Sequence, residues 1–479
     1  MKKSTWLLII LAVLVVGVVV GCVVGLLIGG NNGDNGTTEN GGNTENGGNT
    51  ENGGNTENGG NPPEHTHAFT RQDTSAAYLK NPATCKSPAI YYYSCECGEG
   101  CPETFEDGDL ADHDYQNQAC TVCGALQPSE GIIFESNGDG TCTAVSIGTC
   151  TDAVIVVPAV SPAGERVTVL GTYTEEKDEY DAFMNEDDCN ENCHHLALIL
   201  PEGLVSISPE AVQCDRLMFL VIPDSVTTIG EDAFCDCGGL VRVTLGKGVQ
   251  QIPECTFDSD VLFEIYNRSS LPIVAGSEDF GGLTENAKNV YTESEGESFI
   301  FTDADGFIFY DDGREAYLLG HQEYWTITDL VLPEECHGES YAIIPFFFYE
   351  LDNVVTVKIP DAVTSIGSEA FAGCASLTSV IIGNGVVSIY DCAFSGCAAN
   401  TDGITVVLGD GVAFVDTYVF YFSIVKTVYY SGGESDWRDI EFGGSTEELT
   451  RPDRYYYSEN EPTDGGNYWH WVDGVLTAW

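Results

Sequence analysis

Four cysteines in the N-terminal third of the chain have the residue type and spacing of a metal site. Cys120 and Cys123 form a Cys-x-x-Cys-Gly sequence, and Cys95 and Cys97 form a Cys-x-Cys-Gly sequence. A Cys-x-x-Cys-Gly turn directs two sulfur atoms toward one point, and a second turn would complete the tetrahedral geometry that zinc prefers. We therefore expect these four residues to bind a structural zinc ion. Disulfide bonds, which an extracellular location permits, and unpaired thiols are the open alternatives.

Catalysis is not expected from the sequence. A zinc ion held by four sulfur atoms has no open coordination position. Cys193, His194 and His195 bring a nucleophile and a base together, but adjacent residues rarely converge on one point, and no oxyanion-type glycine motif lies nearby. P-loop, Gly-x-Gly-x-x-Gly, His-Glu-x-x-His and Gly-x-Ser-x-Gly motifs are all absent from the sequence. We therefore predict no enzymatic activity, no catalytic residue and no cofactor beyond the zinc ion.

The charge of the chain excludes several kinds of partner. Its 479 residues include 75 acidic and 18 basic side chains, which gives a net charge of −57. Such a chain repels nucleic acid phosphates and anionic membrane surfaces, so we expect no nucleic acid partner. Carboxylate pairs occur everywhere in so acidic a sequence and do not indicate glycosidase chemistry.

Asp303-Ala-Asp-Gly306 is similar to the start of a calcium loop, but no bidentate glutamate follows at position twelve, so we interpret it as a hairpin turn.

The elements that must position these groups repeat along the chain. The sequence Ile-Pro-x-x-Val-x-x-Ile-Gly-x-x-Ala-Phe-x-x-Cys-x-x-Leu-x-x-Val spans 359–380, begins again at Ile382, and has an equally clear copy over 222–243. A period of about 23 residues is typical of a solenoid, in which each repeat buries its apolar side chains against the next. The alternation over 242–245 predicts a short strand in each repeat, with every second side chain directed inward. The predicted fold is therefore a mainly β solenoid with short parallel strands.

This repeat resembles the BspA-type leucine-rich repeats of bacterial surface proteins, over roughly 150–430. The C-terminal stretch from Val428 to Trp437 and the aromatic tail that ends at Trp479 are similar to the ends of such proteins from gut Firmicutes. The resemblance implies a leucine-rich-repeat solenoid on the cell surface, without enzymatic activity, that binds host or bacterial proteins or glycans in adhesion or interaction. It carries no catalytic residues over to this chain.

Composition divides the rest of the chain. Lys2 and Lys3 precede an apolar run long enough to span a bilayer, so we predict an uncleaved transmembrane signal-anchor that leaves the C-terminal body extracellular. A lipoprotein acylated at Cys22 and simple secretion are the alternatives. The polar Thr-Glu-Asn-Gly-Gly-Asn repeats that follow predict a disordered tether. The predicted segments are a cytoplasmic stub (1–5), the anchor (6–28), the tether (29–63), a cysteine-rich, zinc-ribbon-like module (64–128), opening strands with an irregular first repeat (129–198), leucine-rich repeats (199–266), a β-hairpin insertion (267–329), further repeats (330–430) and a C-terminal cap with an aromatic tail (431–479).

The outward side chains of the repeat strands are the expected binding site. If the strands form a concave sheet, these side chains would line a mixed apolar and weakly basic strip in an otherwise acidic molecule, suited to an extracellular protein or glycan. The residues are Phe219, Val221, Arg242, Thr244, Thr356, Lys358, Ser379 and Ile381. The alternative is a surface-bound metal-dependent glycan receptor or enzyme whose site lies in an insertion, at 172–195 or 267–329.

Overall fold

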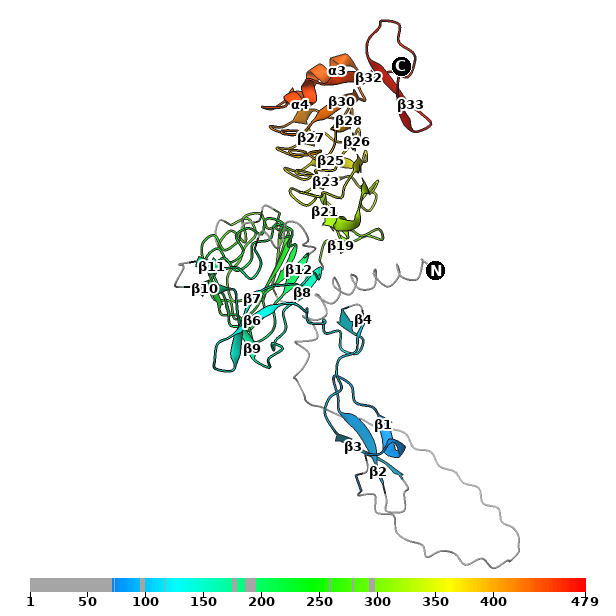
Figure 1. Ribbon diagram of the computed structural model, residues 1–479. Coiled ribbons are helices and arrows are strands. Elements are labelled where there is room, and N and C mark those ends of the chain that lie inside the picture. The colour runs from blue at the N-terminus through cyan, green and yellow to red at the C-terminus, as the bar shows by residue number, and fades with distance from the viewer. Residues whose placement is uncertain are drawn as a thin grey trace, which may run out of the picture. The chain divides into compact units, whose positions relative to one another are not determined.

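The computed structural model describes residues 71–479, apart from 73, 95–99, 117, 175–178, 186–194, 258, 260, 278–279 and 293–297. The chain divides into two compact units, the first ending at Gln127 and the second beginning at Pro128 (Figure 1). The predicted membrane anchor and tether lie outside the described residues. Within the described part of the chain, no helix is both long and apolar enough to cross a membrane.

The first unit is a small β module with little apolar core. Its central strand β2 pairs antiparallel with β1 on one side and β3 on the other, and a separate hairpin joins β4 to β5. Among the described side chains of this unit, the buried apolar ones are Ala89, Phe105 and Cys120. The elements are η1 (Ala76–Tyr78), β1 (Leu79–Asn81), β2 (Ala89–Ser94), β3 (Gly100–Asp107), β4 (Tyr115–Gln116) and β5 (Ala119–Cys120).

The second unit begins with a solenoid of two sheets. One has the order β18-β17-β16-β14-β12-β8 and is parallel throughout; the other has the order β15-β13-β9-β7-β6, with β6 antiparallel. The first sheet consists of β8 (Val154–Val156), β12 (Ala197–Ile199), β14 (Phe219–Val221), β16 (Arg242–Leu245), β17 (Glu264–Asn267) and β18 (Asn289–Thr292). The second consists of β6 (Ile133–Ser136), β7 (Thr141–Ser146), β9 (Arg166–Leu170), β13 (Ser206–Ile207) and β15 (Thr228–Ile229), and β10 (Thr172–Thr174) and β11 (Glu179–Asp181) form a separate hairpin.

A second pair of sheets, of eight strands each, completes the unit. In chain order one contains β19 (Ile300–Thr302), β20 (Phe307–Asp311), β21 (Ala316–His321), β23 (Tyr341–Ile343), β25 (Val363–Ile366), β27 (Ser388–Ile389), β29 (Phe414–Val415) and β31 (Glu441–Phe442). The other contains β22 (Asp329–Val331), β24 (Thr356–Ile359), β26 (Ser379–Ile382), β28 (Ile404–Leu408), β30 (Val425–Tyr430), β32 (Asp453–Tyr457), β33 (Tyr468–Val472) and β34 (Val475–Ala478). The short helices are η2 (Tyr324–Thr326), α3 (Glu434–Asp439) and α4 (Glu447–Thr450).

The strand register confirms the predicted solenoid. Leu220 pairs with Val243, an offset of 23 residues, whereas Val380 pairs with Val406, an offset of 26 residues. Because in-register parallel pairing places equivalent residues side by side, these side chains form continuous rows, and all four are at most 1% exposed. Each repeat therefore contributes one rung to a core that no single repeat could bury.

The Val-x-x-Ile part of the repeat forms a further strand that the sequence analysis does not predict. In β25, Val363 pairs with Tyr341 and Ser365 with Ala342, so Thr364 is an extra residue in the ladder. Such a bulge shifts the alternation of side chains by one position. Val363 and Ile366 can therefore both point into the core, where each is 0% exposed.

The Ala-Phe part of the repeat forms a ladder of phenylalanine rings. Phe348, Phe371, Phe394 and Phe420 stack in succession, with centroids 5.1–5.2 Å apart and ring planes within 8° of parallel. All four rings are at most 1% exposed. The ladder runs along the solenoid and ties consecutive turns to one another.

The glycine that follows the Val-x-x-Ile segment, Gly230 in one repeat and Gly367 in another, reflects close backbone approach. A Cβ atom at Gly367 would lie 2.6 Å from backbone atoms of Ile344 and Pro345 in the preceding turn. We expect Gly367→Ala to lower the free energy of unfolding by about 1–3 kcal/mol, as overpacking generally does. Chemical denaturation measures the loss. Gly444→Ala is the control, since the nearest atom to its added Cβ lies 3.6 Å away; equal losses in the two variants would contradict the steric explanation.

The strand pairing continues past the expected start of the hairpin insertion at residue 267. β18 pairs parallel with β17, which extends the first sheet to Thr292. The antiparallel strands β19, β20 and β21 follow, and β21 pairs parallel with β23 to begin the next sheet. The Asp303–Gly306 segment is a hairpin turn, as predicted: Asp303 Oδ1 accepts the amides of Asp305 and Phe307, each at 2.9 Å. The sequence around β18 departs from the repeat consensus, so the repeat pattern does not predict this strand.

Candidate functional site

The predicted zinc ligands Cys120 and Cys123 lie close together in the first unit. Two further residues that were not predicted as ligands, Cys85 and His113, lie beside them. The sulfur atoms of Cys120 and Cys123, the sulfur of Cys85 and a ring nitrogen of His113 all lie within 4.8 Å of one another. Cys95 and Cys97 lie outside the described residues. No motif points to Cys85, which stands alone in a loop, or to His113, so spacing could not identify either residue as part of the cluster.

The distances within this cluster are those of a tetrahedral metal site rather than of a disulfide. Cys85 Sγ lies 3.6 Å from Cys120 Sγ, and Cys123 Sγ lies 3.2 Å from His113 Nδ1. A disulfide requires about 2.05 Å between its sulfur atoms. Zinc–sulfur bonds of about 2.3 Å arranged tetrahedrally separate two sulfur atoms by about 3.8 Å. Three thiols and one imidazole are also a donor set that suits zinc.

Local hydrogen bonds hold the donors in place. Thr84 Oγ1 accepts the amides of Lys86 at 3.2 Å and Ser87 at 3.1 Å, which folds the turn around Cys85. At the end of the β4–β5 hairpin, the amide of Gly124 donates to the carbonyl of Cys120 at 2.8 Å. Gly124 has φ +75°, a conformation that glycine adopts without strain.

The same turn polarises the sulfur atoms. The amide of Ala125 donates to Cys123 Sγ at 3.4 Å. Burial by itself raises the pKa of Cys120, but hydrogen bonds from the amides of Cys123 and Val122 and from His113 outweigh it and lower the pKa to about 5. Burial and the neighbouring sulfur atoms raise the pKa of Cys85 to about 11. The site therefore stabilises at least one thiolate, the form of cysteine that binds metals.

Two other clusters of reactive residue types are less suited to chemistry. Asp311, Cys336 and His337 also converge, with His337 Nδ1 2.8 Å from Asp311 Oδ2. Burial raises the pKa of Cys336 to about 11, so this thiol is protonated and a poor nucleophile. Cys193 and His194 lie outside the described residues, whereas His195 is buried and its Nδ1 lies 2.7 Å from the carbonyl oxygen of Asp152.

The predicted binding residues lie on outward positions of two different sheets. Cross-strand pairs join Phe219 to Arg242 and Val221 to Thr244 in the first, six-stranded sheet, and Thr356 to Ser379 and Lys358 to Ile381 in the eight-stranded sheet that contains β24 and β26. The eight residues therefore belong to two separate sheets rather than to one strip.

Arg242 and Thr244 are buried, at 7% and 2% exposure, so neither side chain is available to a ligand. Arg242 forms an ion pair with Glu264, whose side chain is 0% exposed, at 2.9 Å. The rings of Phe219 and Tyr266 lie against the guanidinium group, at 5.4 and 5.6 Å from their centroids. Alternation correctly indicates the outward direction of Arg242 but cannot show that other side chains cover it.

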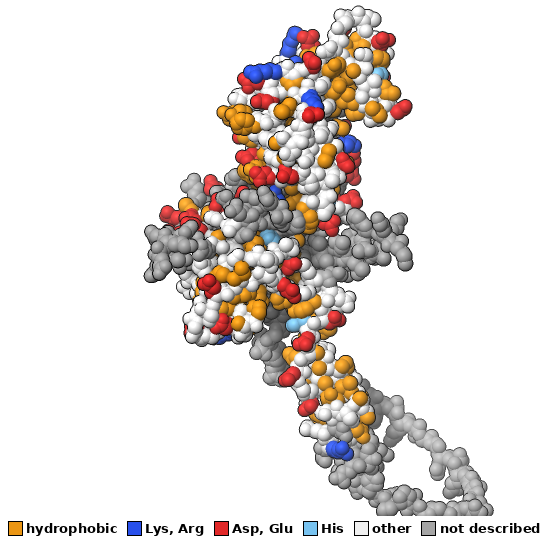
Figure 2. All heavy atoms as spheres, in the orientation of Figure 1, with side chains coloured by type: hydrophobic (Ala, Val, Ile, Leu, Met, Phe, Trp, Pro, Cys, Tyr) orange, Lys and Arg blue, Asp and Glu red, His pale blue; other side chains and the backbone are white. Residues whose placement is uncertain are grey.

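The outward face of the eight-stranded sheet is more exposed, apart from Val407 at 4%, and ends in a cluster of aromatic rings. One outward row of the eight-stranded sheet consists of Val331, Lys358, Ile381, Val407, Tyr429 and Tyr455. Tyr429 and Tyr455 stack at 5.1 Å, and Trp469 lies edge-on to Tyr429 at 5.8 Å. Tyr457 and Trp471, which contact Trp469, are 40% and 43% exposed. Figure 2 shows hydrophobic side chains gathered at this C-terminal end of the solenoid.

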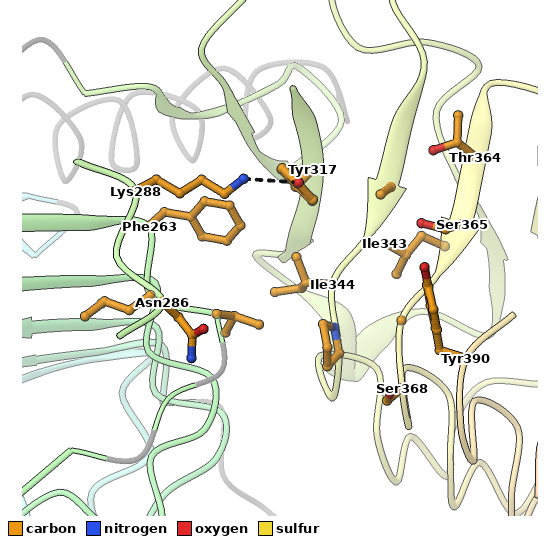
Figure 3. Close-up of a pocket in the computed structure, with 15 residues that line it drawn as sticks. Phe263, Asn286, Lys288, Tyr317, Ile343, Ile344, Thr364, Ser365, Ser368 and Tyr390 are labelled. Carbon is orange, nitrogen blue, oxygen red and sulfur yellow. Dashed lines mark hydrogen bonds between the residues drawn. The ribbon is translucent and has the colours of Figure 1, made fainter. Parts of the chain in front are cut away.

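A pocket of about 560 Å³ lies between the last strands of the first solenoid sheet and the start of the next (Figure 3). Phe263 and Lys288 line one side, and Ile344, Ser365 and Tyr390 line the other. Lys288 is paired with Glu315 and donates to the Tyr317 hydroxyl group at 3.1 Å. The charge of this lysine is thus already neutralised within the protein.

Parallel in-register strands, a repeat of 23 to 26 residues and continuous buried rows define a leucine-rich-repeat solenoid. Residues 185–273 and 341–445 match the BspA type Leucine rich repeat region, in six copies. These two regions therefore consist of BspA-type leucine-rich repeats, as the sequence resemblance indicates.

Solved structures with similarity to the chain have low identity. A leucine rich cell surface protein from Faecalibacterium prausnitzii is 20% identical, with 65% of this chain and 96% of that chain covered and a TM-score of 0.29. The pneumococcal vaccine antigen PcpA is 15% identical, with coverage of 71% and 89% and a TM-score of 0.33. A leucine-rich repeat protein from Eubacterium ventriosum is 15% identical, with coverage of 73% and 98% and a TM-score of 0.28. No curated protein matches the chain.

Proposed function

We propose that this chain is a non-enzymatic cell-surface protein whose solenoid binds an extracellular protein or glycan, in adhesion or another surface interaction. The observation that carries the proposal is the outward row of the eight-stranded sheet, from Val331 to Tyr455, which is exposed or half-buried except at Val407 and ends in aromatic rings. The apolar run at 6–28 would anchor the chain in the membrane, and the polar tether would separate the solenoid from it.

The chemistry of the row supports a binding role. Tyrosine and tryptophan provide large, stiff contact surfaces that also form hydrogen bonds, which is why they are enriched at binding hot spots. Tyr457 and Trp471 keep 40% and 43% of their surface exposed although the rest of the cluster is packed. Lys358, whose side chain is 50% exposed, pairs with the exposed Glu334 at 3.5 Å, and because such surface pairs are weak its ammonium group stays within reach of a ligand.

A binding screen tests the proposal. The full chain is incubated with immobilised matrix proteins, mucin and arrayed glycans, and binding is measured against concentration. We expect saturable binding to at least one of these classes, without turnover of the bound material. Failure to bind any of them, or chemical conversion of one of them by the chain, would contradict the proposal.

A further inference from the structure

We infer that Cys85, His113, Cys120 and Cys123 form a closed zinc site that holds the first unit together. Cys85 and His113, rather than a Cys-x-Cys pair, complete the coordination begun by the Cys-x-x-Cys turn. The inference concerns the N-terminal module and is independent of the ligand-binding role of the solenoid.

The first argument is convergence from separate parts of the chain. Cys85 lies in the turn before β2, His113 lies after β3, and the other two cysteines lie in and after β5. Their donor atoms nevertheless lie within 4.8 Å of one another, with Cys120 only 3% exposed. A metal ion at this point would cross-link the turn at Cys85 to the β4–β5 hairpin, which the strand pairings leave separate from the β1–β3 sheet among the described strands.

The second argument is the size of the core. Among the described side chains before Pro128, Ala89, Phe105 and Cys120 are the apolar ones that are buried. Small domains with so little buried apolar surface generally require disulfides or a structural metal to remain folded. One of these three buried apolar residues, Cys120, is itself a proposed ligand. Metal binding would therefore supply stability that a larger domain obtains from its apolar core.

The third argument decides between zinc and disulfides. A disulfide between Cys85 and Cys120 would have to shorten their 3.6 Å separation and would leave Cys123 beside His113 without a second thiol. Zinc uses all four donors at their present spacing. The hydrogen bond from the Ala125 amide to Cys123 Sγ further suits a thiolate ligand, because a sulfur atom that carries negative charge is the better acceptor.

Such a site is structural. Three thiolates and an imidazole leave no coordination position for water or substrate, so the ion cannot act as a Lewis acid. Its effect would be to fix the turn at Cys85 and the segment around His113 against the β4–β5 hairpin.

Metal analysis of the full chain tests this inference. The chain is purified under reducing conditions, loaded with Zn²⁺, and freed of excess metal before its zinc content is measured. We expect about one zinc ion per chain, with loss of that ion in Cys85→Ser, His113→Ala and Cys120→Ser. Cys255→Ser is the matched control, because Cys255 is an exposed thiol of the second unit, and this variant should keep the ion.

Cobalt substitution provides a second readout that does not depend on stability. Co²⁺ bound by three thiolates and one imidazole shows tetrahedral visible bands and a sulfur-to-cobalt charge-transfer band, and the latter should weaken in Cys85→Ser. Loss of zinc in Cys95→Ser, with zinc retained in Cys85→Ser and His113→Ala, would overturn the proposed ligand set. A wild-type chain that binds no zinc, or one whose Cys120 is found in a disulfide after a separate purification without reductant, would overturn the site itself.

Discussion

Replacing Phe371 with alanine is expected to lower the free energy of unfolding of the solenoid by about 3–5 kcal/mol. The ring is 0% exposed and stacks on Phe348 at 5.2 Å and on Phe394 at 5.1 Å. Its removal therefore leaves a cavity that interrupts the ladder between three consecutive turns. Because a solenoid transmits stability between neighbouring repeats, the loss should also make unfolding less cooperative.

Denaturant unfolding followed by circular dichroism measures this effect. Phe422→Ala is the matched control, because it makes the same chemical change in the same solenoid at a ring that is 77% exposed. The control should change stability by no more than about 0.5 kcal/mol. A negligible change in Phe371→Ala, or equal changes in the two variants, would show that the repeat register is wrong.

The second large effect is expected at the buried ion pair. Arg242→Ala should cost about 3–5 kcal/mol, because it leaves a buried carboxylate without its countercharge. Glu264 is 0% exposed and accepts hydrogen bonds from Arg242 Nε at 2.9 Å and from the amide of Phe299 at 2.7 Å. The pair thus links two turns of the first solenoid sheet to the segment that leads into the next one.

The exposed pair between Lys247 and Asp224 provides the comparison. Its atoms are 3.5 Å apart and the lysine side chain is 60% exposed, so Lys247→Ala should cost about 1 kcal/mol or less. Both variants are measured by denaturant unfolding at the same salt concentration. If Arg242→Ala were no more destabilising than Lys247→Ala, the ion pair would be solvated rather than buried.

The repeat made the fold of the solenoid predictable. Apolar residues at fixed spacing indicate which side chains meet in the core, and Val243, Phe371 and Val380 are buried as the pattern requires. The strand at Val363–Ile366 was not predictable in the same way, because a bulge places two residues three apart on the same side. Spacing alone does not distinguish this arrangement from a turn.

The candidate sites were less predictable, for a physical reason. Sequence spacing identifies donors from one turn, such as Cys120 and Cys123, but not partners such as Cys85 and His113 that folding brings in from elsewhere. Strand alternation likewise indicates which way Arg242 points but not that Phe219 and Tyr266 cover it. Both limits concern contacts between segments that are distant in sequence.

The most direct test of the proposed function compares the affinity of two double variants for the ligand found in the binding screen. Tyr429→Ala with Tyr455→Ala removes the stacked pair of the outward row, whereas Tyr418→Ala with Tyr421→Ala removes rings that are 39% and 36% exposed in a turn outside both sheets. Thermal unfolding first establishes that both variants are folded. We expect the row variant to bind at least about tenfold more weakly, a loss of about 1.4 kcal/mol, and the turn variant to bind as the wild type does. Unchanged affinity of the row variant, with or without a loss in the turn variant, would contradict the proposed function.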